Sequence, residues 1–311
     1  MADRSAHWAE LLTPQLTEAF YIGFSDNARR QSLIPVIFDK RGSERAFEEH
    51  LGVGQFGSEG WNFEVSGRVQ YDQRNKGYLK RYTHVEFAKG FVVQRKLVDD
   101  NLTDISFDDA RELGDAAFRK REKGAASVLN NAFTASGTNE DGLLIEGPDK
   151  VALVSASHPH SQDDATTQSN KATKSLTASA LSEVRRAHMQ LTDDRGDLMD
   201  VMPNELIVPP ELEDTALTVG GSLLDPASAN NAINPQQGRF GIRTWHYLTA
   251  AKNWFIADSS RRARSLLWYD RIPLEFGREE DFDTLQAKFR AYMRYSYGWR
   301  DWAWIYGSEG P

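Results

Sequence analysis

A long helix is the feature that most constrains what this chain can fold into. Ser106 is a suitable N-cap residue and Gly137 a suitable helix stop. Apolar residues recur between them at helical spacing, so we expect a helix over 106–136. At 1.5 Å per residue such a helix is about 40 Å long, well beyond the mean for globular domains. Its apolar face is mostly small-sided and includes Gly114 and Gly124, which let another backbone come close. We therefore expect a scaffold along which other elements pack.

Composition excludes several classes of protein. The 311-residue chain has no cysteine, which removes disulfide frameworks, thiol catalysis and cysteine-based zinc sites. Its formal charge of −8 has the wrong sign for a surface that grips nucleic acid, although an acidic wall can enclose DNA without binding it tightly. The sequence shows no apolar run of membrane-spanning length and no signal-peptide pattern, so we expect synthesis in a cytoplasm.

A long β-hairpin is expected ahead of the helix. Residues 61–71 alternate strictly between apolar and polar, which is typical of a strand with one wet face. A turn ends at Gly77 and a second strand follows through YLKRYTHVEF, so we expect the two to pair in a hairpin over about 61–95. Arms of eleven residues span roughly 35 Å, longer than common strands. Upstream, we expect a short helix over 15–22 and a helical turn over 44–50.

The hairpin and the start of the long helix carry opposite charge. Bases outnumber acids between Arg68 and Lys96, whereas acids dominate from Asp99 to Asp115, where they also suit the helix dipole. A hairpin of this length needs a partner surface, and complementary charge between copies fixes register. The alternative interpretation, in which both segments are only solvated surface, stays open. The residues predicted to form inter-subunit contacts are Arg68, Arg74, Lys76, Lys80, Arg81, Asp99, Asp100, Asp104, Asp108, Asp109 and Glu112.

The second half of the chain indicates mixed helix and strand. We expect a helix over 178–191 capped by Thr177, a buried strand over 205–208 and another helix from near Glu211. A strand over 287–299 alternates apolar with basic and polar side chains, and we expect it to return onto the small-residue face of the long helix. The fold class is therefore α+β.

The order of these parts resembles that of the tailed-bacteriophage major capsid proteins. The chain contains, in order, a basic hairpin ending in YTHVEFAKGFVVQRKLVDD, a helix with RELGDAAFRKREKGAASVLNNAF, the segment NELIVPPELEDTAL, WFIAD, and the strand LQAKFRAYMRYSYGWRDW. The resemblance covers nearly the whole chain and implies the Hong Kong 97-like capsid fold. The parts that it implies are an N-terminal arm over 1–33, an extended loop over 34–95, a peripheral domain over 96–175 and 283–311 that holds the spine helix, and an axial domain over 176–282.

The resemblance implies a structural, non-enzymatic function without a cofactor. Copies of the chain would assemble into hexamers and pentamers of an icosahedral shell, which encloses double-stranded DNA without sequence-specific binding and involves no membrane. The implied partners are other copies of the chain, a portal protein, and a separate scaffolding protein or a decoration protein. The product would be a late protein of the virion, assembled in the cytoplasm of a bacterial host.

A metal-dependent enzyme is one alternative that the residues leave open. His158 and His160 flank a proline and precede Asp163 and Asp164, and imidazole with carboxylate can bind a metal ion. However, no third ligand lies at a recognisable spacing, and the sequence contains no GxSxG elbow, HExxH motif or Walker A lysine. Gly52, Gly54 and Gly57 spell GxGxxG, but a helical turn precedes them where a dinucleotide site needs a strand, so we expect a flexible loop there.

A glycan-binding phage structural module is the second alternative. Trp299, Trp302 and Trp304 could form a platform on which sugar rings stack. Aromatic residues on a long strand more often pack onto a helix, so we expect these tryptophans to be buried.

Overall fold

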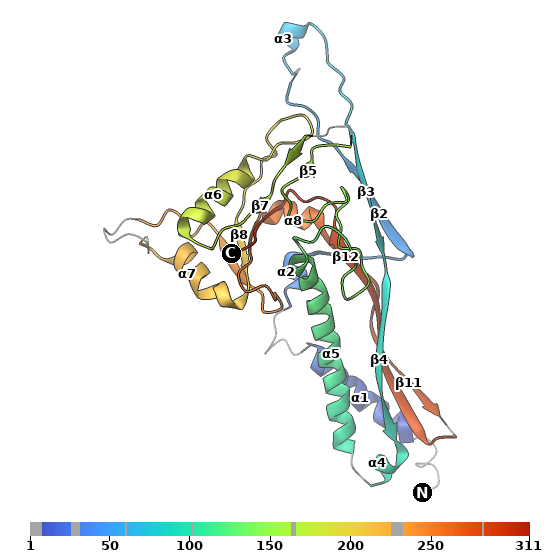
Figure 1. Ribbon diagram of the computed structural model, residues 1–311. Helices are drawn as coiled ribbons and strands as arrows, with labels where there is room; N and C mark the ends of the chain where they lie inside the picture. The colour runs from blue at the N-terminus through green and yellow to red at the C-terminus, as the bar shows by residue number, and fades with distance from the viewer. Residues whose placement is uncertain are drawn as a thin grey trace.

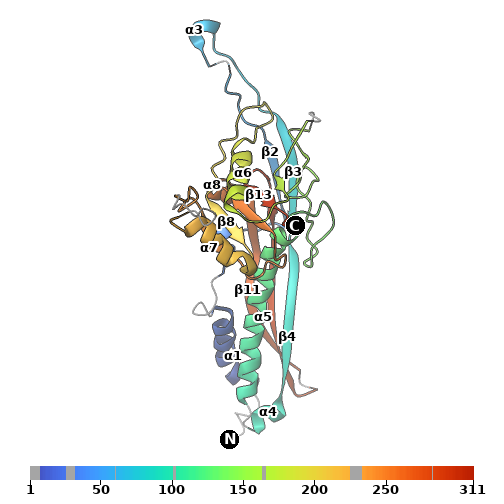
Figure 2. The same cartoon turned by 60° about the vertical axis from the view of Figure 1, so that its left-hand side comes forward.

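The computed structural model describes residues 8–25, 32–59, 61–100, 103–162, 166–224, 233–281 and 283–311. The molecule is elongated (Figure 1). Long strands and helices form a rod, and a compact unit is attached to its side. A narrow hairpin projects beyond both, at the end of the molecule opposite the N-terminus (Figure 2). Within the described ranges, no helix combines the length and the apolar composition needed to cross a membrane.

The rod is built on a four-stranded sheet with the order β1-β11-β12-β4. Antiparallel pairing joins β11 to β12 and β12 to β4, whereas β1 runs parallel to β11. The expected strand over 287–299 is confirmed as β12, whose alternate side chains are buried. The strands are β1 (Asp39–Gly42), β4 (Val85–Gln94), β11 (Leu266–Asp281) and β12 (Gln286–Trp299).

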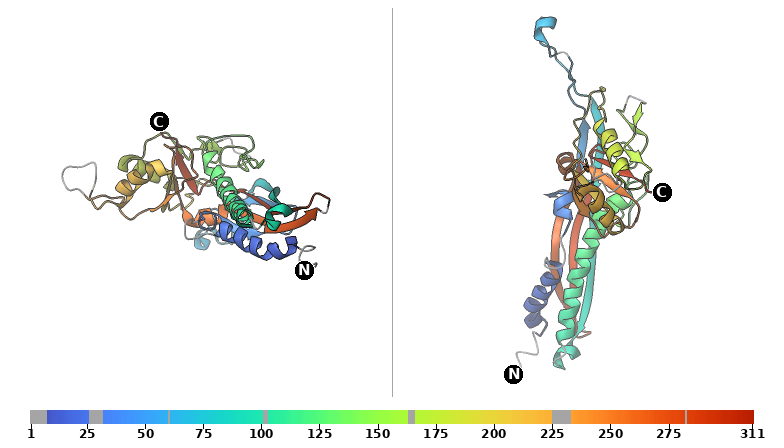
Figure 3. Two further views of the ribbon diagram at one scale, coloured as in Figure 1. Left: turned by 90° about the horizontal axis from the view of Figure 1, so that it is seen from below. Right: turned by 90° about the vertical axis from the view of Figure 1, so that its left-hand side faces the viewer.

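Two long helices lie along this sheet, side by side (Figure 3). The first extends well beyond the expected 15–22, because Trp8, Leu12 and Leu16 continue the buried stripe toward its start. The helices of the rod are α1 (Trp8–Ser25), α2 (Ile34–Ile37), α4 (Arg95–Asp99) and α5 (Thr103–Asn130).

The long helix α5 occupies slightly different residues from those expected. It begins three residues before Ser106, whose buried side chain lies inside the helix and is not its N-cap. It also ends early, at Asn130, where the side-chain amide of Asn131 donates to the carbonyl oxygen of Ser127 at 2.8 Å. The next bond, from the N–H of Ala132 to the carbonyl oxygen of Leu129 at 3.1 Å, tightens the last turn and satisfies a terminal carbonyl group, so the helix ends without reaching a glycine.

Two glycines on α5 set how closely its neighbours approach. A Cβ atom at Gly114 would lie 2.1 Å from the carbonyl oxygen of Phe20 in α1, so the two helices can touch only through glycine. A Cβ atom at Gly124 would lie 3.2 Å from the hydroxyl oxygen of Tyr297 in β12. The small-residue face therefore packs against the returning strand, as expected, and also against α1.

The compact unit contains a five-stranded sheet with the order β7-β13-β10-β8-β9. The expected strand over 205–208 is β8, and the expected helix after Thr177 is α6, with the Thr177 hydroxyl accepting from the N–H of Ala180 at 3.2 Å. A 3₁₀ turn (Pro210–Leu212) leads into α7, where the third helix was expected. The elements are β7 (Lys171–Ala172), α6 (Ala178–Met189), β8 (Glu205–Val208), α7 (Glu213–Gly221), β9 (Gly241–Thr244), β10 (Trp254–Ala257), α8 (Ser259–Ser265) and β13 (Ile305–Ser308). A separate pair, β5 (His158–Pro159) and β6 (Thr167–Gln168), lies beside them.

The projecting hairpin pairs different segments from those expected. β3 (Lys76–Thr83) is antiparallel to β2 (Phe47–Val53), so the helical turn predicted over 44–50 is wrong. The strand predicted over 61–71 is also wrong, because these residues form the short helix α3 (Phe63–Ser66) and exposed loop at the tip. Alternation alone cannot make a strand where no neighbouring strand supplies hydrogen bonds.

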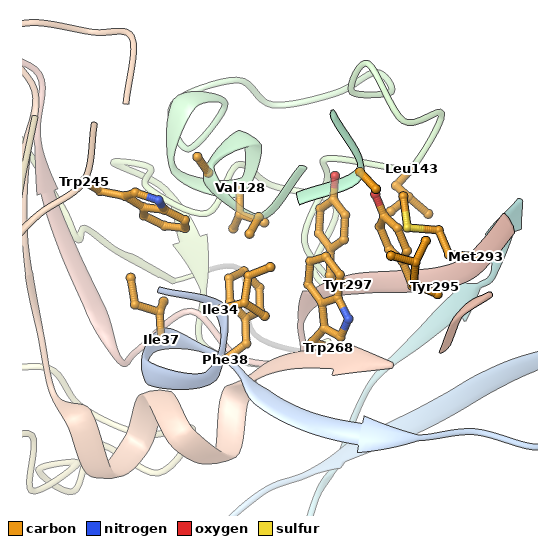
Figure 4. Close-up of a cluster of buried hydrophobic side chains, with 14 of the residues drawn as sticks. Ile34, Ile37, Phe38, Val128, Leu143, Trp245, Trp268, Met293, Tyr295 and Tyr297 are labelled. Carbon is orange, nitrogen blue, oxygen red and sulfur yellow. The ribbon is translucent and has the colours of Figure 1, made fainter. Parts of the chain in front are cut away.

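A buried cluster of aromatic and aliphatic side chains joins the rod to the compact unit (Figure 4). Trp268 stacks on Tyr297 with ring centroids 5.1 Å apart, and Phe38 meets both rings edge-on. Arg262 of α8 reinforces this junction: its Nε donates to Glu205 of β8 at 2.8 Å, and its Nη1 donates to carbonyl groups of α2. The two units are therefore packed as one body around residues from both ends of the chain.

Strand pairing crosses several of the expected domain boundaries. The predicted boundary at 282 would part β11 from β12, yet these strands pair from Leu266–Trp299 to Asp281–Gln286. Residues 266–281 thus belong to the rod, and the last strand, β13, belongs to the compact sheet. The chain crosses between the two units more often than sequence order indicates.

Candidate functional site

The tip of the hairpin exposes several large apolar side chains. Asn62 caps α3 by accepting a hydrogen bond from the N–H of Val65 at 3.2 Å, and Gly67 ends α3 with a φ of +66°. The chain therefore forms a defined turn at the far end of the molecule (Figure 1). Exposed apolar groups gathered on one projecting loop are typical of a surface that contacts another molecule. Those of the tip, each at least 59% exposed, are Phe56, Trp61, Phe63, Val65, Val69 and Tyr71.

Polar contacts fix the base of this loop against a turn of the compact unit. Arg195 forms an ion pair with Asp72, with Nη1 and Oδ2 2.9 Å apart. The hydroxyl and the N–H of Ser58 both donate to Asp197, at 2.7 and 2.8 Å. These hydrogen bonds lower the pKa of Asp197, because they stabilise its charged form. The direction in which the tip projects is thus held by the subunit itself.

The structure places one of the five predicted basic contact residues inside the subunit. The side chain of Lys80 is 8% exposed, and its Nζ donates to the carbonyl oxygen of Glu146 at 2.6 Å. The same Nζ lies 5.6 Å from the ring centroid of Trp299, and burial lowers the pKa of Lys80. Lys80 therefore anchors the hairpin to its own rod. The other four bases are exposed on the hairpin: Arg68, Arg74, Lys76 and Arg81.

Two of these four exposed bases are engaged within the subunit. Arg74 donates from Nε to the carbonyl oxygen of Gly54 at 2.6 Å, and Arg81 donates to Glu49 at 2.7 Å. Arg68 and Lys76, in contrast, form no ion pair with any described residue. They are the bases that remain available for a second molecule.

The six predicted acidic residues lie at the end of the rod, where α4 ends and α5 begins. Glu112 pairs with Arg119, and Asp99 pairs with Arg95 at 3.6 Å between Oδ2 and Nε. Across the part of the chain that the structure describes, no ion pair joins these acids to the predicted bases of the hairpin. Four exposed acids recur at helical spacing on α5: Asp104, Asp108, Asp109 and Glu112. Asp100 is exposed at the end of α4.

The histidines of the metal hypothesis have structural partners instead. His158 is fully buried, its Nδ1 lies 2.7 Å from Asp149, and its ring stacks on Trp302 at 4.0 Å between centroids. His160 contacts the carbonyl oxygen of Asp193 at 3.2 Å. Asp163 and Asp164 lie outside the described residues. Among the residues that are described, no three histidine or acidic side chains come together as a metal site.

The tryptophans of the glycan hypothesis are buried, as the packing interpretation predicts. Trp299, Trp302 and Trp304 have exposed fractions of 3%, 8% and 0%. Side chains with so little exposure cannot present a face on which a sugar ring stacks. Their position on and after β12 makes them part of the main core.

The expected strand over Trp61 to Tyr71 is instead the exposed tip of the hairpin. A local signal was present, because Asn62 three residues before Val65 is a helix cap and Gly67 is a helix stop. The strict alternation outweighed that signal. The apolar face of the expected strand is the set of side chains that the structure leaves in solvent.

Comparisons with known proteins decide between the remaining functions. The sequence matches the model of a family described as phage capsid protein over residues 78–308, well over half of the chain. The chain belongs to the phage capsid protein family. It is a structural protein of a capsid shell and has the Hong Kong 97-like fold. A search of curated proteins gives no match.

Solved structures show the same fold for this phage capsid protein. The capsid of bacteriophage JBD30 matches with a TM-score of 0.55 and 15% identity, covering 71% of this chain and 92% of the other. The mature capsid of bacteriophage PhiM1 matches with a TM-score of 0.55 and 12% identity, covering 90% and 87%. For Microbacterium phage Oxtober96 the TM-score is 0.53 at 12% identity, with 91% and 92% covered. At these identities the likeness concerns the fold alone.

Proposed function

We propose that copies of this capsid protein form the hexamers and pentamers of an icosahedral shell around double-stranded DNA, as the major head protein of a tailed phage. The observation that carries the proposal is the hairpin, which holds exposed apolar residues beyond the rest of its own subunit (Figure 2). Such a hairpin has a clear use only where a neighbouring copy covers it. The formal charge of −8 favours a wall that does not adhere to the enclosed DNA.

In this proposal, two exposed bases of the hairpin, Arg68 in the tip loop and Lys76 at the start of β3, pair with the acids at the start of α5 of a neighbouring copy. Arg68 and Lys76 have no ion-pair partner among the described residues, and neither do Asp108 and Asp109. Charge complementarity between two such segments fixes the register of neighbours more than it adds affinity. Lys80 has no part in this contact, since it is buried in its own subunit.

The domain assignment of the resemblance is retained with altered bounds. We take the rod as the peripheral domain with α5 as spine helix, and the compact unit as the axial domain that gathers at the centre of each hexamer or pentamer. The second hydrophobic cluster, between α6, α7 and the five-stranded sheet, supports treating the compact unit as a structural entity.

Other partners follow from the same proposal. The solved JBD30 capsid is decorated with minor capsid protein trimers, which supports a decoration protein as a partner here as well. A portal protein and a separate scaffolding protein complete the expected set. Assembly would take place in the cytoplasm of the bacterial host.

Electron microscopy of the overexpressed full chain tests the proposal. We expect closed shells of uniform size, formed by the chain alone or together with a scaffolding partner. Only small discrete oligomers under every condition, including co-expression with the neighbouring genes of the phage, would contradict it.

A further inference from the structure

Two histidines lie where the hairpin leaves the rod. His50 is on β2, and His84 lies between β3 and β4, so each strand of the hairpin has one ring at its base. Nε2 of His50 contacts the hydroxyl group of Tyr269 in β11. Nδ1 of His84 lies 2.9 Å from the hydroxyl oxygen of Ser296 in β12. Imidazole groups therefore fasten the base of the hairpin to two adjacent strands of the rod.

The partners of His84 fix where its proton lies. The hydroxyl group of Ser43 donates to Glu48 at 2.8 Å and accepts from the N–H of Arg45 at 3.2 Å. Because its proton is used, Ser43 accepts from Nε2 of His84, which is 3.1 Å away. Nδ1 is then the acceptor for the hydroxyl group of Ser296. A second proton on this buried ring would force that hydroxyl group to turn its own proton away.

His50 meets Tyr269 in a similar, protonation-dependent way. Burial raises the pKa of Tyr269, so its hydroxyl group keeps its proton. Because Arg41 donates a hydrogen bond to the same hydroxyl group, that proton is directed at Nε2 of His50. Tyr82 of β3 packs edge-on against the His50 ring, with centroids 5.8 Å apart, and also contacts the ring of Tyr269. A proton at Nε2 would turn the acceptor of this contact into a second donor.

Positive charge surrounds both rings. Burial lowers the pKa of His50, and two arginines lower it further. Burial lowers the pKa of His84 as well, and two other arginines act in the same direction. Among the described residues, Glu48 is the acid that acts in the opposite direction at both rings. The arginines are Arg300 and Arg41 at His50, and Arg294 and Arg271 at His84.

Two of these four arginines are partly compensated by acids. Arg41 pairs with Asp39 at 2.7 Å, and Nε of Arg294 lies 3.9 Å from Glu86. The other two form no ion pair with any residue that the structure describes: Arg271 and Arg300. Protonation of either histidine would therefore add charge beside uncompensated positive charge, in addition to disturbing its hydrogen bond.

The closed base of the hairpin is thus favoured only while the rings are neutral. In water an imidazole binds a proton below about pH 6.5, whereas the closed base keeps both rings neutral to a lower pH. The closed base is therefore fully favoured above about pH 6.5 and loses stability as the pH falls below that value. Contacts nearer the tip persist in this interval. Lys80 stays bound to Glu146, and hydrogen bonds lower the pKa of Asp72, which keeps its ion pair with Arg195.

We propose that His50 and His84 form a proton-sensitive latch, which holds the base of the hairpin on the rod and opens when the two rings are protonated. Because the contacts nearer the tip persist, residues 43–50 come free while β3 stays attached, and the hairpin can pivot about β3. The latch is a property of the single subunit. It goes beyond the proposed function and does not depend on the assembly of a shell.

Hydrogen exchange of the unassembled full-length subunit tests the latch, because protection of amides reports local opening. The rates are compared between about pH 7.5 and about pH 5.5 and corrected for the exchange of unstructured amides. We expect opening over 43–51 to be roughly tenfold more frequent at the lower pH, since it lies about one unit below the pKa of a free imidazole. Opening over 113–129 of α5 should not change. No rise over 43–51, or the same rise in both segments, would overturn the proposal.

The matched variants replace histidine with glutamine, which keeps a donor and an acceptor but binds no proton. His50→Gln with His84→Gln should remove most of the tenfold rise. The control is His246→Gln, at an exposed histidine of the compact unit, and it should keep the full rise. A rise of the same size in the double variant and in the control would assign the pH dependence to other groups and overturn the proposal.

A second test leaves both histidines in place, so it does not depend on the folding of the double variant. Arg300 is exposed, and its charge lowers the pKa of His50. Arg300→Gln should therefore reduce the rise from about tenfold to about threefold. The control is Arg264→Gln, at an exposed arginine of α8, which should leave the rise unchanged. Equal rises in the two arginine variants would contradict the latch.

Discussion

At the scale of single residues, His158 has the side chain of a candidate metal ligand, but its contacts are those of a core residue. Its ring is buried, with Nδ1 2.7 Å from Oδ2 of Asp149 and its face stacked on the indole of Trp302. His188 is also fully buried, and its Nε2 donates to the carbonyl oxygen of Ala303 at 2.9 Å. Burial lowers the pKa of His188 to about 4, because the charged ring would lose its hydration. His188 is therefore uncharged at neutral pH, and its hydrogen bond joins α6 to Ala303, two residues before β13.

This pKa predicts that acid destabilises the subunit. His188 binds a proton in the unfolded chain below pH 6.5, but in the folded chain only near pH 4, so the free energy of unfolding falls as the pH drops through that interval. Between pH 7 and pH 5 we expect a loss of about 2 kcal/mol from this group. Urea unfolding of the unassembled subunit at both pH values measures it.

The matched variant for this prediction is His188→Gln, which keeps a side chain able to donate to Ala303. Its free energy of unfolding should depend less on pH by about the same 2 kcal/mol. Some dependence should remain, since burial also lowers the pKa of His50 and of His84. An identical pH dependence in variant and unmodified protein would exclude His188 as the source.

At the scale of elements, the pairing of α1 with α5 depends on the absence of a side chain. The backbone of α1 fits against Gly114 so closely that a Cβ atom would lie 2.1 Å from one carbonyl oxygen and 2.8 Å from the N of Phe24. Backbone atoms of a helix cannot give way as a flexible side chain can. The helices would have to separate, and Leu16 and Phe20, now fully buried, would lose contact with the core.

Gly114→Ala should therefore lower the free energy of unfolding by about 2 kcal/mol. We also expect α1 to be cut by protease at a lower enzyme concentration, since its packing is weakened. The control is Gly221→Ala on α7, where an added Cβ meets no atom within 4 Å and should change stability little. Equal stability of the two variants would mean that α1 adjusts without loss of packing.

At the scale of the whole molecule, the single subunit leaves two surfaces of opposite charge exposed. The rod presents acids at the start of α5, and the hairpin carries Arg68 and Lys76 away from the rod. Within the described part of the chain, neither set neutralises the other. In the proposed shell, these two sets of charges face each other between neighbouring copies.

Charge reversal on the hairpin tests this complementarity. Arg68→Glu with Lys76→Glu should lower the yield of shells by about tenfold while the subunit keeps its unfolding temperature, because like charges would then face each other across the interface. Adding Asp108→Lys and Asp109→Lys should restore part of the yield. Counting particles by electron microscopy measures both effects.

The control for this reversal changes the same number of charges in the compact unit, through Arg186→Glu with Arg239→Glu, both exposed. If that pair lowers the yield as strongly as the hairpin pair, net charge and not the hairpin contact is responsible. Normal assembly of the hairpin variant would show that the acids of α5 are not the partners of Arg68 and Lys76.

By itself, the sequence determined the periodic elements and their order. The 3.6-residue pattern of α5 and the two-residue pattern of β12 were visible because each buries one continuous face, and burial imposes a period. The order of these elements also sufficed for the family resemblance, which the match over residues 78–308 confirmed.

Tertiary structure alone decided which segments pair and which side chains remain in solvent. The alternation over 61–71 has the local pattern of a strand, but β3 pairs with β2 and the segment is left exposed at the tip. Lys80 and His158 are buried by contacts with Glu146 and Trp302, 66 and 144 residues away in the chain. Strand pairing and burial depend on neighbours distant in sequence, and no local pattern records them.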